Sequence, residues 1–203
     1  SFTAMMYAAW AALAREPVDL ERISEGCANI LQTTIPMMQR LADARFDRVV
    51  YLGSGPFKGL AREAALKLME LTDGKIPTSF DSPLGFRHGP KTVVTDRTMV
   101  MLFMSNDPLT RAYDMDLRAE LIADSKAAEI VTLSAIDDIE DAILVPGMAD
   151  AKDPELLYPY IIAPQIYGLL ASLDAGLTPD NPNVSGTVNR VVQGVRLHAC
   201  ETV

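Results

Sequence analysis

The sequence is poor in the residues that most often build metal and redox sites. It has two cysteines and two histidines among 203 residues. Cys27 and Cys200 stand far apart, in no CxxC or other metal-ligand spacing, and no HxxxH or Asp/His metal spacing is present. We therefore expect no metal. Two distant thiols in a methionine-rich chain are typical of a reducing compartment, which predicts a cytoplasmic protein.

Long apolar runs and basic runs are also missing. No apolar run reaches the roughly 18 residues that a membrane span needs, and the longest, such as Ile161 to Leu173, contain polar breaks. Lys and Arg number 18 against 27 Asp and Glu, a net charge of −9, without any Lys/Arg-rich run. Neither a membrane nor a nucleic acid is expected as a partner.

The chain start lacks the basic region of a signal peptide. It begins at Ser1 without a methionine, and we expect a fragment whose first part is missing.

The residues that are present favour one α/β domain behind a pair of helices. The chain is 49% hydrophobic, enough for a sizeable core. An alanine-rich helix is predicted from residue 1 to about Arg15. Asp19 is a suitable cap for a second helix, from about Leu20 to Ala44, which Pro36 is expected to kink. We assign residues 1–44 to linker helices and residues 45–203 to an α/β domain with a C-terminal helix and tail.

Short apolar runs alternate with helical patterns along the rest of the chain. Such alternation predicts a parallel sheet covered on both faces, a three-layer α-β-α sandwich with five strands. The predicted strands are 48–52, 76–80, 98–104, 129–133 and 142–145, and the predicted helices are 57–72, 108–125 and 154–173. Ligands bind such sheets at the carboxyl ends of the strands, where the sequence places loops 53–56, 85–91 and 105–107.

The first of these loops is glycine-rich. Gly53, Gly55 and Gly59 do not have the GxGxxG spacing of a dinucleotide site, so a Rossmann dehydrogenase is not expected. A Gly-Ser-Gly turn that leads into a helix can hold a phosphate with its backbone N–H groups. A tight strand-to-helix turn without a ligand explains the same residues equally well.

Two further features carry ionisable side chains. Glu63, Lys67 and Glu70 share one helix face, which is either the solvated face or a carboxylate tuned by a neighbouring cation to act as a general base. His88 stands in the segment GFRHGPK, as a surface turn residue or as a functional group. Because GxSxG is absent and neither cysteine is a credible nucleophile, acid–base chemistry by Glu and His is the enzymatic option.

The combined motifs resemble the SIS (sugar isomerase) family. YLGSGPFKGLAREAALKLMEL followed by DSPLGFRHGPKTVV matches its pattern of G-x-G, a helix reading E-x-A-L-K-L-x-E, and a loop ending H-G-P. The match looks closest to tagatose-6-phosphate ketose/aldose isomerases and galactosamine-6-phosphate deaminases, and is more distant to the isomerase half of glucosamine-6-phosphate synthase. It implies a flavodoxin-like domain without a cofactor, the second of two SIS domains in tandem, as part of a cytoplasmic homodimer.

The resemblance also implies roles for particular residues. Glu70 matches the glutamate that moves a proton between C1 and C2 of the open-chain sugar. His88 matches a histidine that assists ring opening across a subunit interface. We expect the sugar phosphate to be bound by Ser54, Gly55, Lys67 and Arg190.

Two departures from the family pattern bear on these roles. Arg190 stands where the synthase has a lysine, and an arginine cannot form an imine. The loop Ser105 to Thr110 resembles a degenerate phosphate cradle, because Asp107 would repel a phosphate.

Three functions remain open from the sequence. The first is a sugar-phosphate aldose/ketose isomerase or amino-sugar-phosphate deaminase. The second is a non-catalytic module that binds a sugar phosphate or dimerises, since a fold does not fix a function. The third is a scaffold half that is inactive without its first domain.

Overall fold

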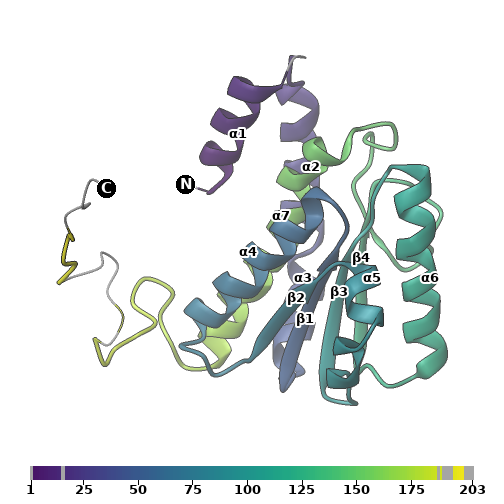
Figure 1. Ribbon diagram of the computed structural model, residues 1–203. Helices are drawn as coiled ribbons and strands as arrows, with labels where there is room; N and C mark the ends of the chain where they lie inside the picture. The colour runs from purple at the N-terminus through teal and green to yellow at the C-terminus, as the bar shows by residue number, and fades with distance from the viewer. Residues whose placement is uncertain (1, 15–16, 187, 189–193, 199–203) are drawn as a thin grey trace, which may run out of the picture.

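The protein folds into a parallel sheet that lies between two layers of helices (Figure 1). The computed structural model describes residues 2–14, 17–186, 188 and 194–198. All described strands pair in parallel in the order β2-β1-β3-β4-β5, which confirms the predicted five-stranded three-layer sandwich and its flavodoxin-like order. The strands are β1 (Arg48–Gly53), β2 (Thr78–Asp81), β3 (Thr98–Phe103), β4 (Glu129–Ser134) and β5 (Ile143–Leu144).

One helical layer holds the larger part of the core. It consists of α2 (Leu20–Thr33), α3 (Ile35–Asp43), α4 (Pro56–Leu71) and α7 (Asp153–Asp174), with α7 in contact with the other three. Because side chains alternate along a strand, Val49 and Tyr51 of β1 face this layer. The short α1 (Phe2–Leu13) has no buried residue and contacts the layer through Trp10, whose ring stacks on Tyr158 at 6.1 Å.

The opposite layer covers the other face of the same strands. It contains α5 (Pro83–Arg87), the 3₁₀ turn η1 (Pro90–Val93) and α6 (Pro108–Asp124). Val50 and Leu52 of β1 pack there in one cluster with Phe86 of α5 and Leu117 of α6. The sheet therefore separates α4 from α5 (Figure 1).

The predicted helix over residues 20–44 is two helices. Thr34 lies between α2 and α3, and its side-chain hydroxyl donates to the Ile30 carbonyl oxygen at 2.7 Å. Pro36 occupies the first turn of α3, where its missing N–H is not needed. α2 and α3 contribute buried residues such as Ile30 and Met38 to the core, while the domain boundary at residue 44 stays a prediction.

The segment GFRHGPK, predicted to be a loop, is mostly helical. Ser82 caps α5 by accepting a hydrogen bond from the Gly85 N–H at 3.2 Å, and Pro83 fits the first turn. Phe86 is buried against the sheet and anchors the short helix. The prediction of a loop was wrong because Phe86, four residues after the Ser82 cap, packs against the sheet and stabilises a helix too short to form by propensity alone.

Helix α7 is long and apolar enough to cross a membrane by composition, alone among the helices of the described residues. A helix was predicted here from the sequence, but not one apolar enough to span a membrane. In the structure the helix is mostly buried between α2, α3 and α4, as core helices of soluble proteins are.

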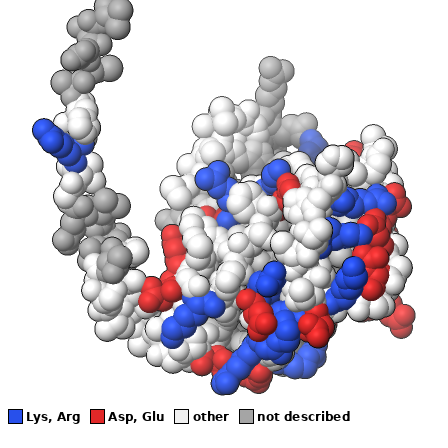
Figure 2. Space-filling view, turned by 60° about the horizontal axis from the view of Figure 1, so that its bottom comes forward, with Lys and Arg blue, Asp and Glu red and all other residues white. Residues whose placement is uncertain are grey.

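On the face shown in Figure 2, Lys and Arg are interspersed with Asp and Glu and form no single basic patch.

The close approach of β1 to α4 predicts opposite effects for two glycine substitutions. A Cβ at Gly53 would lie 2.5 Å from the Phe57 Cβ and 2.8 Å from its carbonyl oxygen, whereas a Cβ at the exposed Gly59 meets nothing within 4 Å. We expect Gly53→Ala to lower the free energy of unfolding by about 1–3 kcal/mol. Gly59→Ala should raise it by roughly 0.5–1 kcal/mol through helix propensity.

Urea denaturation of both variants measures the two effects. Equal stability of the two variants would contradict the tight contact between β1 and α4.

Candidate active site

Glu70 and Lys67 form an ion pair on the last turns of α4. The Lys67 Nζ lies 2.7 Å from the Glu70 Oε2, and the two side chains are 43% and 47% exposed. The hydrogen bond to Glu70 raises the pKa of Lys67 from its ordinary value, so the ammonium stays charged. The inward face of α4 carries its buried residues, such as Leu60, Ala64 and Leu68, which directs the pair outward.

The pair lines a cleft of about 810 Å³. One wall is the C-terminal end of α4 with Asp73 and Gly74, and the other is the tail segment Pro179–Asn183 with Val188. The Asn183 side-chain amide donates to the Asp73 carboxylate at 2.6 Å and joins the two walls. Two segments far apart in the sequence, the C-terminal end of α4 and the tail segment Pro179–Asn183, thus meet at this cleft.

His88 lies elsewhere. It is the C-cap residue of α5, and its side chain is exposed. Since α4 and α5 cover opposite faces of the sheet, Glu70 and His88 do not meet within one chain. Arg190 falls outside the described residues, two positions after the cleft-lining Val188 in the sequence.

Ser54 and Gly55 stand at the other end of α4. Gly55 is its N-cap residue, with a positive φ of 52° that favours glycine. The helix rises by about 1.5 Å per residue, so residues 55 and 70 are separated by about 22 Å. The predicted site residues therefore form one pair at the cleft, a second group at the start of α4 and an isolated histidine.

A carboxylate network fills the carboxyl end of the sheet. The Ser54 Oγ donates to the Asp114 Oδ1 at 2.6 Å, and the Ser105 N–H donates to its Oδ2 at 3.1 Å. Asp153 accepts from the Ser105 Oγ at 2.6 Å and from the Asn106 N–H at 2.8 Å. The hydroxyl groups of Ser54 and Ser105 and the backbone N–H groups of Ser105 and Asn106 thus already donate to carboxylates, and they are not free to bind a phosphate.

The turn into α6 is closed in the same way. Asp107 caps α6 by accepting from the Thr110 N–H at 2.8 Å and from its hydroxyl, and the backbone hydrogen bond is the main cause that lowers the Asp107 pKa. The buried Arg111 supports the turn by donating to the Ser105 carbonyl oxygen at 3.1 Å and to the Ser134 Oγ at 2.9 Å. This arrangement is consistent with the expected degenerate cradle.

Arg111, Asp114 and Asp153 were not predicted from the sequence. A signal for two of them exists, because Arg111 and Asp114 are charged residues one turn apart on the buried face of α6. No group of three or more His, Cys, Asp and Glu side chains in the described ranges is arranged to hold a metal ion.

The fold and the cleft define a class of protein: a three-layer α/β domain of the flavodoxin type, with a helix-borne carboxylate facing a cleft. No protein-family model matches the chain. It is 43% identical over 206 residues to the D-galactosamine-6-phosphate deaminase AgaS of Escherichia coli, covering 98% of this chain and 54% of the relative. The chain thus spans about half the length of the curated relatives it matches.

Comparison with solved structures gives the same family relationship. A Clostridium novyi protein proposed to be a tagatose-6-phosphate ketose/aldose isomerase has a TM-score of 0.82 and 39% identity, over 89% of this chain and 48% of that one. The tagatose-6-phosphate ketose/aldose isomerase of Escherichia coli has a TM-score of 0.69 and 38% identity, over 78% and 45%. The chain belongs to the SIS (sugar isomerase) family, as the sequence motifs predicted.

The buried Asp114 predicts a characteristic pH dependence. Desolvation is the largest cause that raises its pKa above the ordinary 3.8, so its stabilising contribution is full below pH 3.8 and is lost as the pH rises through the raised pKa. The unfolding free energy of wild type minus that of Asp114→Asn should therefore fall as the pH rises from 3.8.

Denaturant unfolding across that range measures the difference. A difference that is flat, or that grows with pH, would rule out a desolvated carboxyl at this position.

Proposed function

We propose that the chain is the glutamate-bearing half of a sugar-phosphate aldose/ketose isomerase or amino-sugar-phosphate deaminase, of the galactosamine-6-phosphate to tagatose-6-phosphate type. The observation that carries the proposal is the Lys67–Glu70 pair lining a cleft of about 810 Å³. The names of the relatives support the substrate class. A cytoplasmic location and a homodimer belong to the same proposal.

Glu70 is the base of the proposed reaction. Its carboxylate removes the proton from C2 of the open-chain amino sugar and returns it to C1, while the C2 amine gives up one proton and the C1 carbonyl oxygen gains one. The double bond thereby moves from the C1 oxygen to the C2 nitrogen. For an amino sugar the product is a C2 imine, and water hydrolyses it to the keto sugar and ammonium. For an aldose, the C2 hydroxyl gives up the proton that the C1 oxygen gains, and the same transfer between C2 and C1 gives the ketose directly. A single carboxylate placed between C1 and C2 serves both substrates.

Three further ionisable side chains complete the proposed site. The Lys67 ammonium holds the carboxylate by its 2.7 Å ion pair and is also near enough to the cleft to contact the sugar. Arg190 would contact the phosphate, because a guanidinium binds phosphate oxygens in pairs. His88 would come from the neighbouring subunit and move a proton at the ring oxygen. Ser54 and Gly55 are not part of this cleft, so the substrate contact that the sequence predicted for them belongs to a competing binding mode at the carboxyl end of the sheet.

The proposal predicts that Glu70→Gln removes turnover from the full-length protein. Glutamine keeps the size of the side chain but cannot accept a proton, and losing a general base typically costs about 10²–10⁴-fold in rate. Ammonia release from galactosamine-6-phosphate, and interconversion of tagatose-6-phosphate with its aldose, measure the effect. Glu63→Gln is the matched control, since it removes the same charge from α4 at a residue outside the cleft lining.

Two outcomes would reject the proposal. Turnover of Glu70→Gln at the wild-type rate would exclude Glu70 as the base. Absence of turnover in the wild-type full-length protein, with galactosamine-6-phosphate still bound, would instead favour the non-catalytic module.

A further inference from the structure

No polar interaction within the described residues fixes the His88 side chain. Its ring is exposed and makes no hydrogen bond or ion pair to any part of the chain that the structure describes. Its backbone N–H donates to the Gly85 carbonyl oxygen at 3.3 Å, at the end of a helix of only five residues. The direction of the imidazole is therefore set by whatever fixes α5 and η1.

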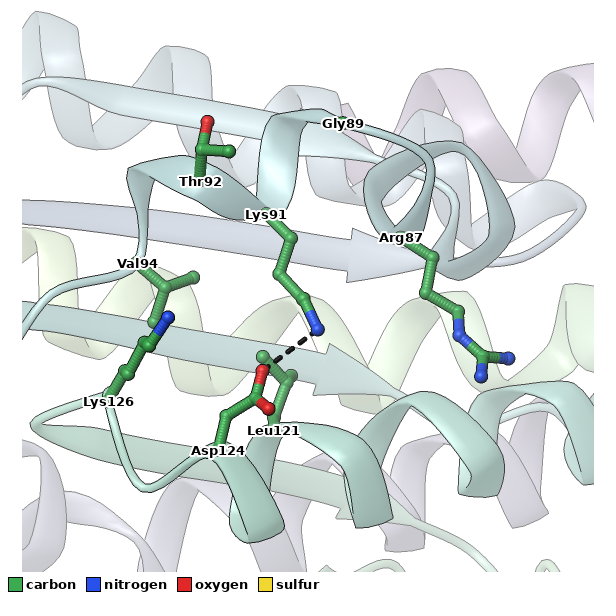
Figure 3. Close-up of a pocket in the computed structure, with 8 residues that line it drawn as sticks. All are labelled: Arg87, Gly89, Lys91, Thr92, Val94, Leu121, Asp124 and Lys126. Atoms are coloured by element: carbon green, nitrogen blue, oxygen red, sulfur yellow. Dashed lines mark hydrogen bonds and ion pairs between the residues drawn. The ribbon is translucent and has the colours of Figure 1, made fainter.

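Carboxylates on α6 connect to the cations on both sides of His88. The Arg87 Nε lies 2.6 Å from the Glu120 Oε2, and the Lys91 Nζ pairs with the other oxygen of the same carboxylate. Lys91 also lies 2.8 Å from the Asp124 Oδ2. Figure 3 shows Lys91 extending from η1 to Asp124 on α6. Glu120 thus joins the residue before His88 to the third residue after it.

Packing is incomplete below the middle of the segment. A cavity of about 200 Å³ lies between η1 and α6 (Figure 3), lined by Gly89, Thr92, Val94 and Leu121 beside the charged residues. Phe86 anchors the segment before His88, and Val93 and Val94 pack in the same cluster at the end of η1, whereas the Lys91 side chain between them bridges the hollow. The hydrogen bonds from Lys91 and Arg87 hold the pKa of Glu120 below its ordinary value, so the carboxylate stays charged at neutral pH.

We propose that Glu120 is a positioning residue for His88: by holding Arg87 and Lys91 together, it fixes the backbone that presents the imidazole to a substrate. This inference rests on the proposed function, in which His88 acts on the sugar ring. Surface ion pairs contribute little to overall stability, so the effect of Glu120 is expected in catalysis and not in folding.

The test is the Glu120→Gln variant of the full-length protein, assayed by ammonia release from galactosamine-6-phosphate. We expect kcat to fall about tenfold, because small displacements of a catalytic group cost one to two orders of magnitude, while KM changes less than about twofold. Arg87→Met removes one of the ion pairs, and its kcat should lie between the kcat of wild type and that of Glu120→Gln. Asp116→Asn removes the same charge one turn earlier on α6, from an exposed residue, and should leave kcat unchanged.

A second background separates positioning from a structural effect. In His88→Asn, which we expect to be slow itself, adding Glu120→Gln should cause no further loss, because the group that Glu120 positions is absent. The same tenfold loss in both backgrounds, or no loss in the wild-type background, would overturn the positioning role while leaving the proposed function intact. A His88→Asn variant as fast as wild type would overturn the role of His88 and the positioning role with it.

Discussion

Helix α4 lies so close to β1 that a Cβ on Gly53 would overlap Phe57. The helix is fixed along the sheet by this contact and by its buried face against α7. Its length then determines where its functional side chains lie. Ser54 and Gly55 stay at the carboxyl end of the sheet, whereas Glu70 is carried about 22 Å away, to the end where the tail returns and the cleft opens.

The same sheet divides the proposed catalytic groups between its two faces. Glu70 is on the α4 side and His88 on the α5 side, so a single copy of the described chain does not bring them together. The proposed function meets this constraint by taking the histidine from a neighbouring subunit. A histidine used in that way must be exposed and must be held from behind, which is the arrangement of His88 between Arg87 and Lys91.

Much of the fold could be predicted because its signals are local. Apolar runs such as residues 98–103, punctuated by glycine and proline, predicted the strands and the helices between them within a few residues. The Lys67–Glu70 pair followed from helical spacing. The network of Ser54, Asp114 and Asp153 could not be predicted, because its hydrogen bonds join residues that lie up to 60 positions apart in the sequence. Helix α5 was missed because tertiary packing of Phe86, more than propensity, stabilises a helix so short.

If Glu70 is the base, the sugar phosphate binds at the Glu70 cleft and not at the carboxyl end of the sheet. A crystal structure of the full-length Glu70→Gln protein with galactosamine-6-phosphate tests it most directly. We expect C1 and C2 of the sugar to lie within roughly 3.5 Å of the residue 70 side chain, with the Ser54–Asp114 hydrogen bond unchanged. A sugar phosphate seated at Ser54 and Ser105, with that hydrogen bond broken and the cleft empty, would contradict it.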